Sequence, residues 1–310
     1  MVPAKRPEFG LMDRLPPVRG ILQEDAPLAK FSWFKTGGMA DVLFQPADGD
    51  DLADFLKAKP AEVPVAVIGT AANIIIRDGG VEGVVIRSGA GFADIDIDGD
   101  IVTAGSAAHD VTVARKARDA GLAGLEFLSG IPGTIGGGLR MNAGAYGTEF
   151  KDIFVEAEAL DGGGTSHRLD LAAMGFEYRQ CGAPDDWIFT KARLRGVPGE
   201  RDAITRRMDE IQAEREKTQP LRTPTGGSTF RNPKGAKAWE LIEKAGCRSL
   251  LRGKAQVSDL HCNFLINTGG ATATDLEGLG EEVRRRVFDD SGITLEWEIR
   301  LIGRAKGRLS

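Results

Sequence analysis

Residues 130–147 form the stretch that most restricts how this chain can fold. The segment has the sequence GIPGTIGGGLRMNAGAYG and contains seven glycines but only one charged residue. Each glycine costs conformational entropy on folding, so this density implies that something comes very close to the backbone. Two explanations fit. The glycines serve tight turns, or their bare N–H groups form a nest for an anion such as a pyrophosphate.

A second run of small residues follows an expected strand at 63–69. It places Gly69, Thr70, Ala71, Ala72 and Asn73 at the strand end, where small residues let the backbone approach a ligand. Neither G-x-G-x-x-G nor G-x-x-x-x-G-K-[ST] occurs, which argues against a dinucleotide fingerprint and a P-loop. Two small-residue loops, one in each lobe, predict a large anionic cofactor, a nucleotide, between the lobes.

Charge and cysteine content exclude several classes of protein. The 310 residues carry a net charge of -5 without a long basic run, so we expect neither nucleic acid nor an anionic membrane surface as the main partner. Three scattered cysteines, Cys181, Cys247 and Cys262, form no C-x-x-C pair and indicate buried thiols rather than a zinc or disulfide site. With no signal peptide and no membrane-length apolar run, we expect a cytoplasmic protein without metal.

The pattern along the chain predicts alternating helices and strands, and hence an α+β fold. Asp110 is the expected cap of one helix, and a TDLE capping box at Thr274 is expected to start the last one. Expected helices span 51–60, 109–121, 202–217 and 236–246, with a last one starting at 274; expected strands or hairpins span 35–48, 63–69, 81–87, 92–105, 154–170, 186–196, 262–267 and 292–303. Residues 223–235 are expected to be a loop, and a domain boundary is expected near residue 200.

The segment DIDIDGD within 92–105 allows two interpretations. It resembles the start of a calcium-binding loop, but the twelfth position, where a bidentate carboxylate is needed, is Gly105. Apolar and acidic residues also alternate around an Asp-Gly pair, which is the strongest short hairpin signal. The hairpin is therefore the preferred interpretation.

Taken in order, the motifs resemble those of the UDP-N-acetylenolpyruvoylglucosamine reductase family over nearly the whole chain. The flavin signature is GLEFLSGIPGTIGGGLRMNAGAYG, and the other motifs are SWFKTGGMAD, FEYRQC, TGGSTFRNP, AWELIEKAG, AQVSDLHCNFLIN and GITLEWEIRLIG. The resemblance implies a two-lobed FAD-binding domain of the vanillyl-alcohol-oxidase/PCMH type and a C-terminal α+β substrate-binding domain. It implies an N-terminal arm (1–34), an FAD domain (35–200, with lobes of about 35–87 and 88–200), a substrate domain (201–303) and a tail (304–310).

The resemblance also implies non-covalent FAD, NADPH as hydride donor and a UDP-sugar enolpyruvyl ether as substrate, reduced to UDP-N-acetylmuramate for peptidoglycan synthesis by a monomeric enzyme. Ser228 would donate the proton, Arg179 would bind the substrate carboxylate, and Glu298 rather than Glu296 would share a proton through a raised pKa. Tyr178, Lys217 and Asn232 would bind substrate. The implied FAD-binding residues are Gly69, Thr70, Ala71, Ala72, Asn73, Ser129, Gly130, Ile131, Pro132, Gly133, Thr134, Gly136, Gly137, Asn142 and Gly144.

Some positions depart from the family pattern. The first phosphate loop is usually G-x-G-S-N, and here Ala71 and Ala72 replace a glycine and a serine. Cys181 stands where serine is common, and the inserted segment that carries a substrate-clamping tyrosine in one branch of the family is absent. Two rival functions are an alcohol oxidase or dehydrogenase of the same flavin superfamily and a binding protein that has lost its chemistry. No role is assigned to His261.

Overall fold

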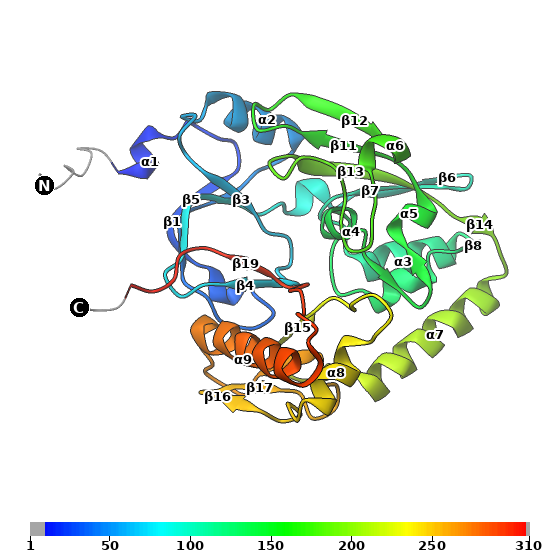
Figure 1. Cartoon of the computed structure of the whole chain (residues 1–310). Coiled ribbons are helices and arrows are strands. Elements are labelled where there is room, and N and C mark those ends of the chain that lie inside the picture. The colour runs from blue at the N-terminus through cyan, green and yellow to red at the C-terminus, as the bar shows by residue number, and fades with distance from the viewer. Residues whose placement is uncertain (1–9, 308–310) are drawn as a thin grey trace, which may run out of the picture.

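The computed structural model describes residues 10–307, and its first part is a small mixed sheet (Figure 1). The sheet has the order β1-β2-β5-β3, in which β1 is antiparallel to β2, and both β2 and β3 are parallel to β5. The helix α2 covers it with Leu52, Phe55 and Leu56. The elements are α1 (Leu11–Arg14), β1 (Ile21–Pro27), η1 (Leu28–Lys30), β2 (Met39–Gln45), α2 (Gly49–Ala58), β3 (Val65–Val67), β4 (Ile74–Ile76), β5 (Val81–Ile86) and η2 (Ala90–Phe92).

The second part is a five-stranded antiparallel sheet in the order β12-β11-β13-β7-β6. The segment 92–105 is the expected hairpin, with Gly99 at φ +57° in its turn. Helices α3 and α4 pack against this sheet through a shared apolar core. The elements are β6 (Ile95–Asp98), β7 (Ile101–Gly105), α3 (Asp110–Asp119), β8 (Leu122–Ala123), η3 (Glu126–Gly130), α4 (Ile135–Met141), β9 (Gly144–Ala145), β10 (Thr148–Glu149), α5 (Phe150–Ile153), β11 (Phe154–Leu160), β12 (Ser166–Asp170), α6 (Leu171–Met174), β13 (Ile188–Arg195) and β14 (Val197–Pro198).

The third part begins with the long helix α7 and adds a four-stranded antiparallel sheet, β15-β18-β17-β16, covered by α8 and α9. Along α9, Leu276, Leu279 and Val283 are buried, as expected from their spacing. The elements are α7 (Arg201–Thr218), β15 (Thr225–Ser228), α8 (Ala238–Lys244), β16 (Leu251–Arg252), β17 (Ala255–Val257), β18 (Phe264–Asn267), α9 (Ala273–Ser291) and β19 (Arg300–Ile302).

The last strand returns to the first part of the chain. β19 pairs in parallel with β4, with Arg300 opposite Ile74 and Ile302 opposite Ile76, as Figure 1 shows. Just after β4, Asp78 accepts hydrogen bonds from the amides of Ala273 and Thr274 in the first turn of α9. The fold class is therefore α+β, and the C-terminal part is joined to the segment around β4 at two neighbouring points.

Several sequence predictions were wrong in detail. Residues 292–303 form a strand only at 300–302, because Glu298 donates its N–H to the Thr229 carbonyl and Glu296 accepts from the Arg231 amide, outside any regular ladder. The capping box of α9 is Thr272 with Asp275, two residues earlier than expected. Within the expected loop 223–235, residues 225–228 form β15, because Thr225 and Ser228 pair with β18.

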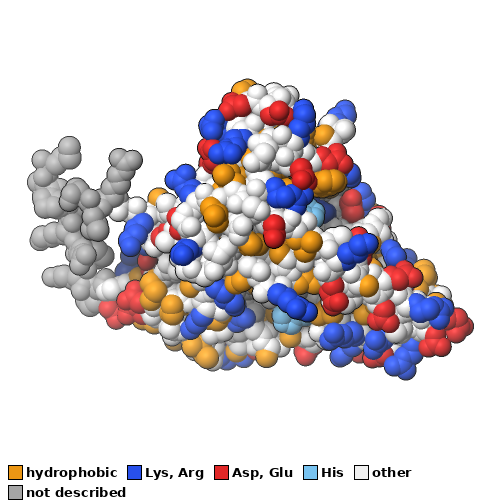
Figure 2. Space-filling model, turned by 90° about the horizontal axis from the view of Figure 1, so that it is seen from below, with side chains coloured by type: hydrophobic (Ala, Val, Ile, Leu, Met, Phe, Trp, Pro, Cys, Tyr) orange, Lys and Arg blue, Asp and Glu red, His pale blue; other side chains and the backbone are white. Residues whose placement is uncertain are grey.

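Asp110 is not the cap of α3. His109 occupies the N-cap position without a side-chain hydrogen bond, and Asp110 is the first helical residue, fully buried. Residues 1–9 of the expected arm and 308–310 of the expected tail lie outside the described residues. Over residues 10–307, no helix has the length and hydropathy needed to cross a membrane. On the face shown in Figure 2, basic and acidic side chains are interspersed rather than gathered by sign.

Candidate active site

The two small-residue loops predicted from the sequence lie against each other. A Cβ atom on Gly69 would be 3.0 Å from the Thr134 Oγ1, which belongs to the glycine stretch. Both Ala71 and Ala72 are buried, and Ala71 adopts a left-handed backbone at φ +48°. The end of β3 and the start of α4 therefore face each other with little side-chain material between them.

The glycines of the stretch have two different roles. A Cβ on Gly136 would be 3.0 Å from the Ser106 Cβ, and one on Gly138 would be 2.2 Å from the Phe150 ring, so these glycines allow close internal packing. A Cβ on Gly137 would meet only Thr134 Oγ1, at 4.0 Å. The face of the loop at Gly137 is therefore open to a ligand, and both explanations offered for the glycines apply, to different residues.

Two predicted cofactor ligands use their side chains within the protein. Ser129 donates its hydroxyl to the Glu126 carbonyl at 2.7 Å. Asn142 is fully buried, donates to Glu149 Oε2 and the Glu177 carbonyl, and accepts from the Lys151 amide. These side chains shape the loop, so contacts with a cofactor would come from the backbone there. Glycine and alanine at the two facing loops leave the main-chain groups accessible, which suits the binding of a diphosphate.

Arg179 lies in a tight turn at 177–180, where Glu177 and Gln180 exchange backbone hydrogen bonds, and its own φ is +59°. Its Nε donates to Glu298 Oε1 at 3.0 Å, and its Nη2 donates to the Gly144 carbonyl at 2.9 Å. The side chain is one-fifth exposed. Two contacts from separate parts of the chain thus fix the guanidinium, and its other N–H donors have no partner among the described residues 10–307.

Glu298 is held by its own backbone as well as by Arg179. Its N–H donates to the Thr229 carbonyl at 2.9 Å, and its carbonyl accepts from the Asn73 side-chain amide at 3.0 Å. Burial raises the pKa of the Glu298 carboxyl, and the positive charges of Arg179 and Arg231 oppose that rise without cancelling it. The carboxyl is therefore poised to hold a proton at a higher pH than an exposed glutamate.

Ser228 ends β15, directly after Gly227, whose φ of +77° turns the chain. Within residues 10–307 its hydroxyl has no hydrogen-bond partner, and it is not among the buried polar atoms. The next residue, Thr229, is the one that holds the Glu298 backbone. The structure thus pairs Arg179 with Glu298, and it places Ser228 one residue before the backbone contact between Thr229 and Glu298.

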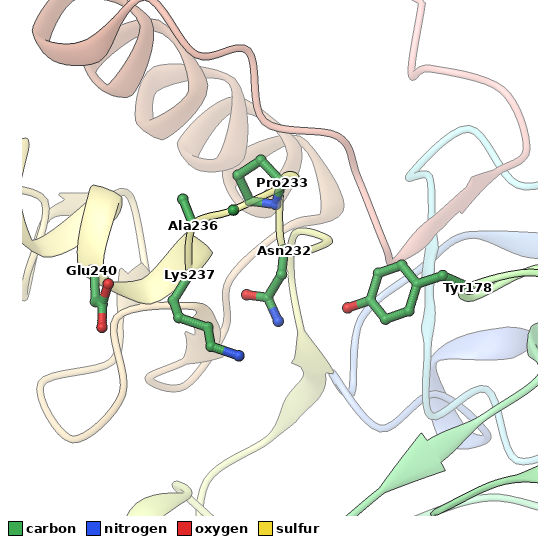
Figure 3. A pocket seen from close by; sticks show the side chains of 7 residues that line it. Tyr178, Asn232, Pro233, Ala236, Lys237 and Glu240 are labelled. Atoms are coloured by element: carbon green, nitrogen blue, oxygen red, sulfur yellow. The ribbon is translucent and has the colours of Figure 1, made fainter. Parts of the chain in front are cut away.

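A pocket of about 420 Å³ opens at Tyr178, the residue before Arg179 in the Tyr-Arg motif. In Figure 3 the Lys237 ammonium and the Asn232 amide point the same way, and the Tyr178 hydroxyl is directed toward Asn232. Tyr178 is 46% exposed, and Asn232 accepts a hydrogen bond from the Ala238 amide at the start of α8. The pocket is lined by Tyr178, Asn232, Pro233, Gly235, Ala236, Lys237 and Glu240.

The sequence interpretation missed several polar residues at this site. Arg231 donates to the Arg179 carbonyl and pairs with Glu296, and Lys237 lines the pocket. The adjoining basic residue in FRNP was a usable signal for Arg231, whereas nothing in the local sequence singles out Lys237. Lys217, by contrast, is exposed in the last turn of α7 and is not among the pocket residues. Over residues 10–307, no group of three or more His, Cys, Asp or Glu could hold a metal ion.

Comparison with known proteins agrees with this arrangement. Residues 40–170 match the model of an FAD binding domain, and residues 219–302 match that of the UDP-N-acetylenolpyruvoylglucosamine reductase C-terminal domain. The chain is 62% identical over 298 residues to UDP-N-acetylenolpyruvoylglucosamine reductase from Parvibaculum lavamentivorans, covering 96% of both chains. It is 59% identical over 289 residues to the reductase from Azorhizobium caulinodans, covering 93% of this chain and 94% of that one.

A solved structure gives the same result. The crystal structure of UDP-N-acetylenolpyruvylglucosamine reductase from Thermus caldophilus superposes with a TM-score of 0.80 at 31% identity, over 93% of this chain and 100% of that chain. The two-lobed FAD domain followed by a C-terminal α+β domain is thus the architecture that the sequence predicted. The chain belongs to the UDP-N-acetylenolpyruvoylglucosamine reductase family, and it is an oxidoreductase with FAD as its cofactor.

Proposed function

We propose that the protein uses NADPH to reduce the enolpyruvyl ether of UDP-N-acetylglucosamine to UDP-N-acetylmuramate, with Arg179, Ser228 and Glu298 as its catalytic residues. The observation that carries the proposal is the Arg179–Glu298 pair. The Glu298 backbone is in turn held by Thr229, the residue after Ser228, and by Asn73 of the first small-residue loop. When bound, FAD supplies the transfer of a hydride from NADPH to the methylene carbon of the substrate. The chain's own residues would orient the substrate and donate the proton.

Arg179 has the geometry needed to bind the substrate carboxylate. Its Nε and Nη2 are each fixed by one acceptor, so the guanidinium is preorganised before the substrate arrives. Negative charge develops on the carboxylate and the adjoining carbon during reduction, and a fixed guanidinium stabilises it without reorganisation. Glu298, whose pKa is raised by burial, would hold a proton close to that carboxylate and so avoid repelling it.

Ser228 would deliver the proton to the carbon next to the substrate carboxylate. A serine hydroxyl is a weak acid, but the enolate-like intermediate is a much stronger base than a carboxylate. The hydroxyl is accessible and has no partner within the described residues, so it is free to point at the substrate. A positioned general acid contributes about 10²- to 10⁴-fold to a rate.

The pocket at Tyr178 would hold the rest of the substrate. Lys237, Asn232 and Tyr178 present an ammonium, an amide and a hydroxyl, which together suit an anionic diphosphate. Lys217 is exposed at the end of α7 and is not among the residues that line this pocket, so we propose no diphosphate contact for it. The loops 69–73 and 129–137, with Asn142 and Gly144 behind them, would hold FAD mainly through backbone groups. We further propose a cytoplasmic monomer, to be tested by light scattering and cell fractionation.

The spectrum of the purified protein tests the proposal. We expect a flavin absorption that NADPH bleaches and that the enolpyruvyl sugar nucleotide restores under anaerobic conditions, with colour released on denaturation. Reoxidation by oxygen alone, with no response to the sugar nucleotide, would instead identify an oxidase.

Replacing Ser228 with Ala separates the two half-reactions. Bleaching by NADPH should keep its wild-type rate, whereas reoxidation by the sugar nucleotide should slow by about 100-fold or more, because the proton donor is lost. Stopped-flow absorption measures both rates, and Ser166→Ala, on the exposed strand β12, serves as the matched control. Equal reoxidation rates in the Ser228→Ala variant and the wild type would remove Ser228 from the mechanism.

A further inference from the structure

Arg215, in the last turn of α7, is a charged residue without a counter-ion. Its side chain is partly buried, and its Nε is fully buried without a hydrogen-bond partner. Over residues 10–307, its guanidinium makes neither an ion pair nor a hydrogen bond. Because only the Nε is enclosed in this way, the two terminal nitrogens remain within reach of a ligand.

Two other arginines with a buried, unpartnered Nε show how the protein normally treats such a group. Arg87 lies over the Phe31 ring, 4.7 Å from its centroid. Arg231 donates to the Arg179 carbonyl and pairs with Glu296. In both cases another group of the protein contacts the guanidinium, whereas among residues 10–307 no ion pair, hydrogen bond or aromatic ring does so at Arg215. Burial accordingly lowers the pKa of Arg215, and only Tyr146 opposes the shift.

The glycine stretch determines where this guanidinium lies. A Cβ on Gly130 would be 2.6 Å from the Tyr146 ring and 2.9 Å from Ile211 of α7, so the bare glycine lets all three pack together. The Tyr146 hydroxyl lies 3.5 Å from the Ile211 carbonyl. Arg215 follows Ile211 by one helical turn and therefore projects on the same side of α7, beside Tyr146.

The same loop carries both Tyr146 and the carbonyl that fixes Arg179. Gly144 accepts from Arg179, and Tyr146, two residues later, packs on α7 next to Arg215. A partly buried guanidinium that lacks a counter-ion is costly, and anions are its usual partners. Each nucleotide that the enzyme would meet, whether FAD, NADPH or a UDP-sugar, carries a diphosphate.

We infer that Arg215, rather than the exposed Lys217, is the cation of α7 that binds a diphosphate of a nucleotide held at this site. The chemistry of recognition is a guanidinium donating to phosphate oxygens, next to the Tyr146 hydroxyl. The inference rests on the FAD cofactor and, for the UDP-sugar, on the proposed function. Three nucleotides could supply the diphosphate, and the arms of the experiment distinguish them.

The test compares the FAD-loaded wild type with Arg215→Gln, Arg215→Lys and the control Arg206→Gln, an exposed position on the same helix. Flavin fluorescence on dilution gives the dissociation constant of FAD. Calorimetry with the enolpyruvyl sugar nucleotide and with NADP⁺ gives the other two dissociation constants. Arg215→Gln should weaken at least one of the three by about tenfold or more, because a hydrogen bond to a charged group is lost.

Further readouts separate phosphate binding from packing. The loss of affinity in Arg215→Gln should shrink as salt concentration rises, because salt screens an electrostatic contact. Arg215→Lys should restore part of the affinity, because lysine keeps the positive charge. Three unchanged dissociation constants in Arg215→Gln, or a loss that is independent of salt and not rescued by lysine, would overturn the inference. If the wild type fails to bind the sugar nucleotide, the proposed function fails, while the FAD arm still decides the role of Arg215.

Discussion

Asp110 is a carboxyl group enclosed at the start of α3, next to the glycine stretch. It is 0% exposed, and both of its side-chain oxygens lack hydrogen-bond partners within the described residues. A Cβ on Gly133 would lie 2.9 Å from one of these oxygens. Burial raises the pKa of Asp110 well above its ordinary value. The folded protein therefore favours the neutral, protonated acid at this position.

Because the pKa of Asp110 is raised in the folded state, this residue should make the free energy of unfolding decrease as pH rises. The stabilising contribution of Asp110 to the free energy of unfolding is fully present below the unfolded-state pKa of about 3.9. It is lost as pH rises toward the folded-state pKa. In the neutral variant Asp110→Asn this loss should be absent. The variant should therefore gain stability relative to the wild type with increasing pH, by up to about 1.4 kcal/mol per pH unit.

Urea unfolding of the FAD-loaded proteins between pH 4 and pH 8 measures this difference. The exposed hairpin residue Asp96, changed to Asn, should run parallel to the wild type and provides the control. A constant difference between Asp110→Asn and the wild type across the pH range would mean that Asp110 is ionised in the folded state.

At the residue scale, motif resemblance singles out the residues that we propose as catalytic, but not the groups that surround them. Arg179, Ser228 and Glu298 each lie in a distinctive motif, so a linear sequence singles them out. Asp110, Arg215 and Arg231 matter because of what surrounds them after folding, and no local pattern reports that an arginine will lack a counter-ion. Asn73 likewise was expected to face a cofactor, whereas its amide donates to the Glu298 carbonyl.

At the scale of the element, two reciprocal hydrogen bonds between side chain and backbone cap the N-terminus of α9. Thr272 accepts from the Asp275 amide and its own amide donates to the Asp275 carboxylate, both at 3.0 Å. This reciprocal pair satisfies two backbone donors that the helix itself cannot satisfy.

Removing the cap should destabilise the protein measurably. Thr272→Ala is expected to lower the free energy of unfolding by about 1 kcal/mol, because the Asp275 amide loses its acceptor. Denaturant unfolding measures the change. Thr205→Ala, whose hydroxyl bonds only to its own helix, is the control and should change stability by less than about 0.5 kcal/mol. An equal loss in both variants would contradict the capping role.

Elements with strong periodicity were predicted well, and those defined by long-range pairing were not. The helix expected at 202–217 is α7, and the ranges 92–105 and 154–170 each form a hairpin, because their patterns are local. Residues 292–303 have the alternation of a strand, but Glu296, Glu298 and Ile299 hydrogen-bond to the segment 229–231 instead of to a neighbouring strand. Tertiary contacts therefore determine the conformation of residues 292–303, and the alternation of apolar and polar residues alone could not predict them.

At the scale of the whole molecule, a small polar cluster joins the segment between β4 and β5 to the C-terminal part. Arg77 forms a bidentate pair with Glu277, and Asp78 accepts from the amides of Ala273 and Thr274. Burial raises the pKa of Asp78, but the hydrogen bonds from Thr274 and Ala273 outweigh it, so the pKa is lowered. The stabilisation it gives is present above the unfolded-state pKa of about 3.9 and is lost as pH falls toward the folded-state pKa.

Asp78→Ala should loosen this junction. We expect a loss of about 1–3 kcal/mol at pH 7, because the first-turn amides of α9 lose a charged acceptor, and a smaller loss near pH 3. Chemical unfolding at the two pH values measures the effect, with exposed Asp50→Ala in α2 as the control. A loss of the same size at both pH values would show that the carboxylate charge is not involved.

The domain boundary expected near residue 200 stays a prediction.

The pairing of β4 with β19 has a consequence for how the enzyme is made. The two strands are separated by more than 200 residues, yet β19 supplies the only strand partner that β4 has among residues 10–307. A ribosome must therefore synthesise nearly the entire polypeptide before the neighbourhood of Asn73 and Glu298 can be completed. Nascent chains stalled before residue 300 should remain colourless in the presence of flavin, and pigment should appear only after the last strand has left the exit tunnel.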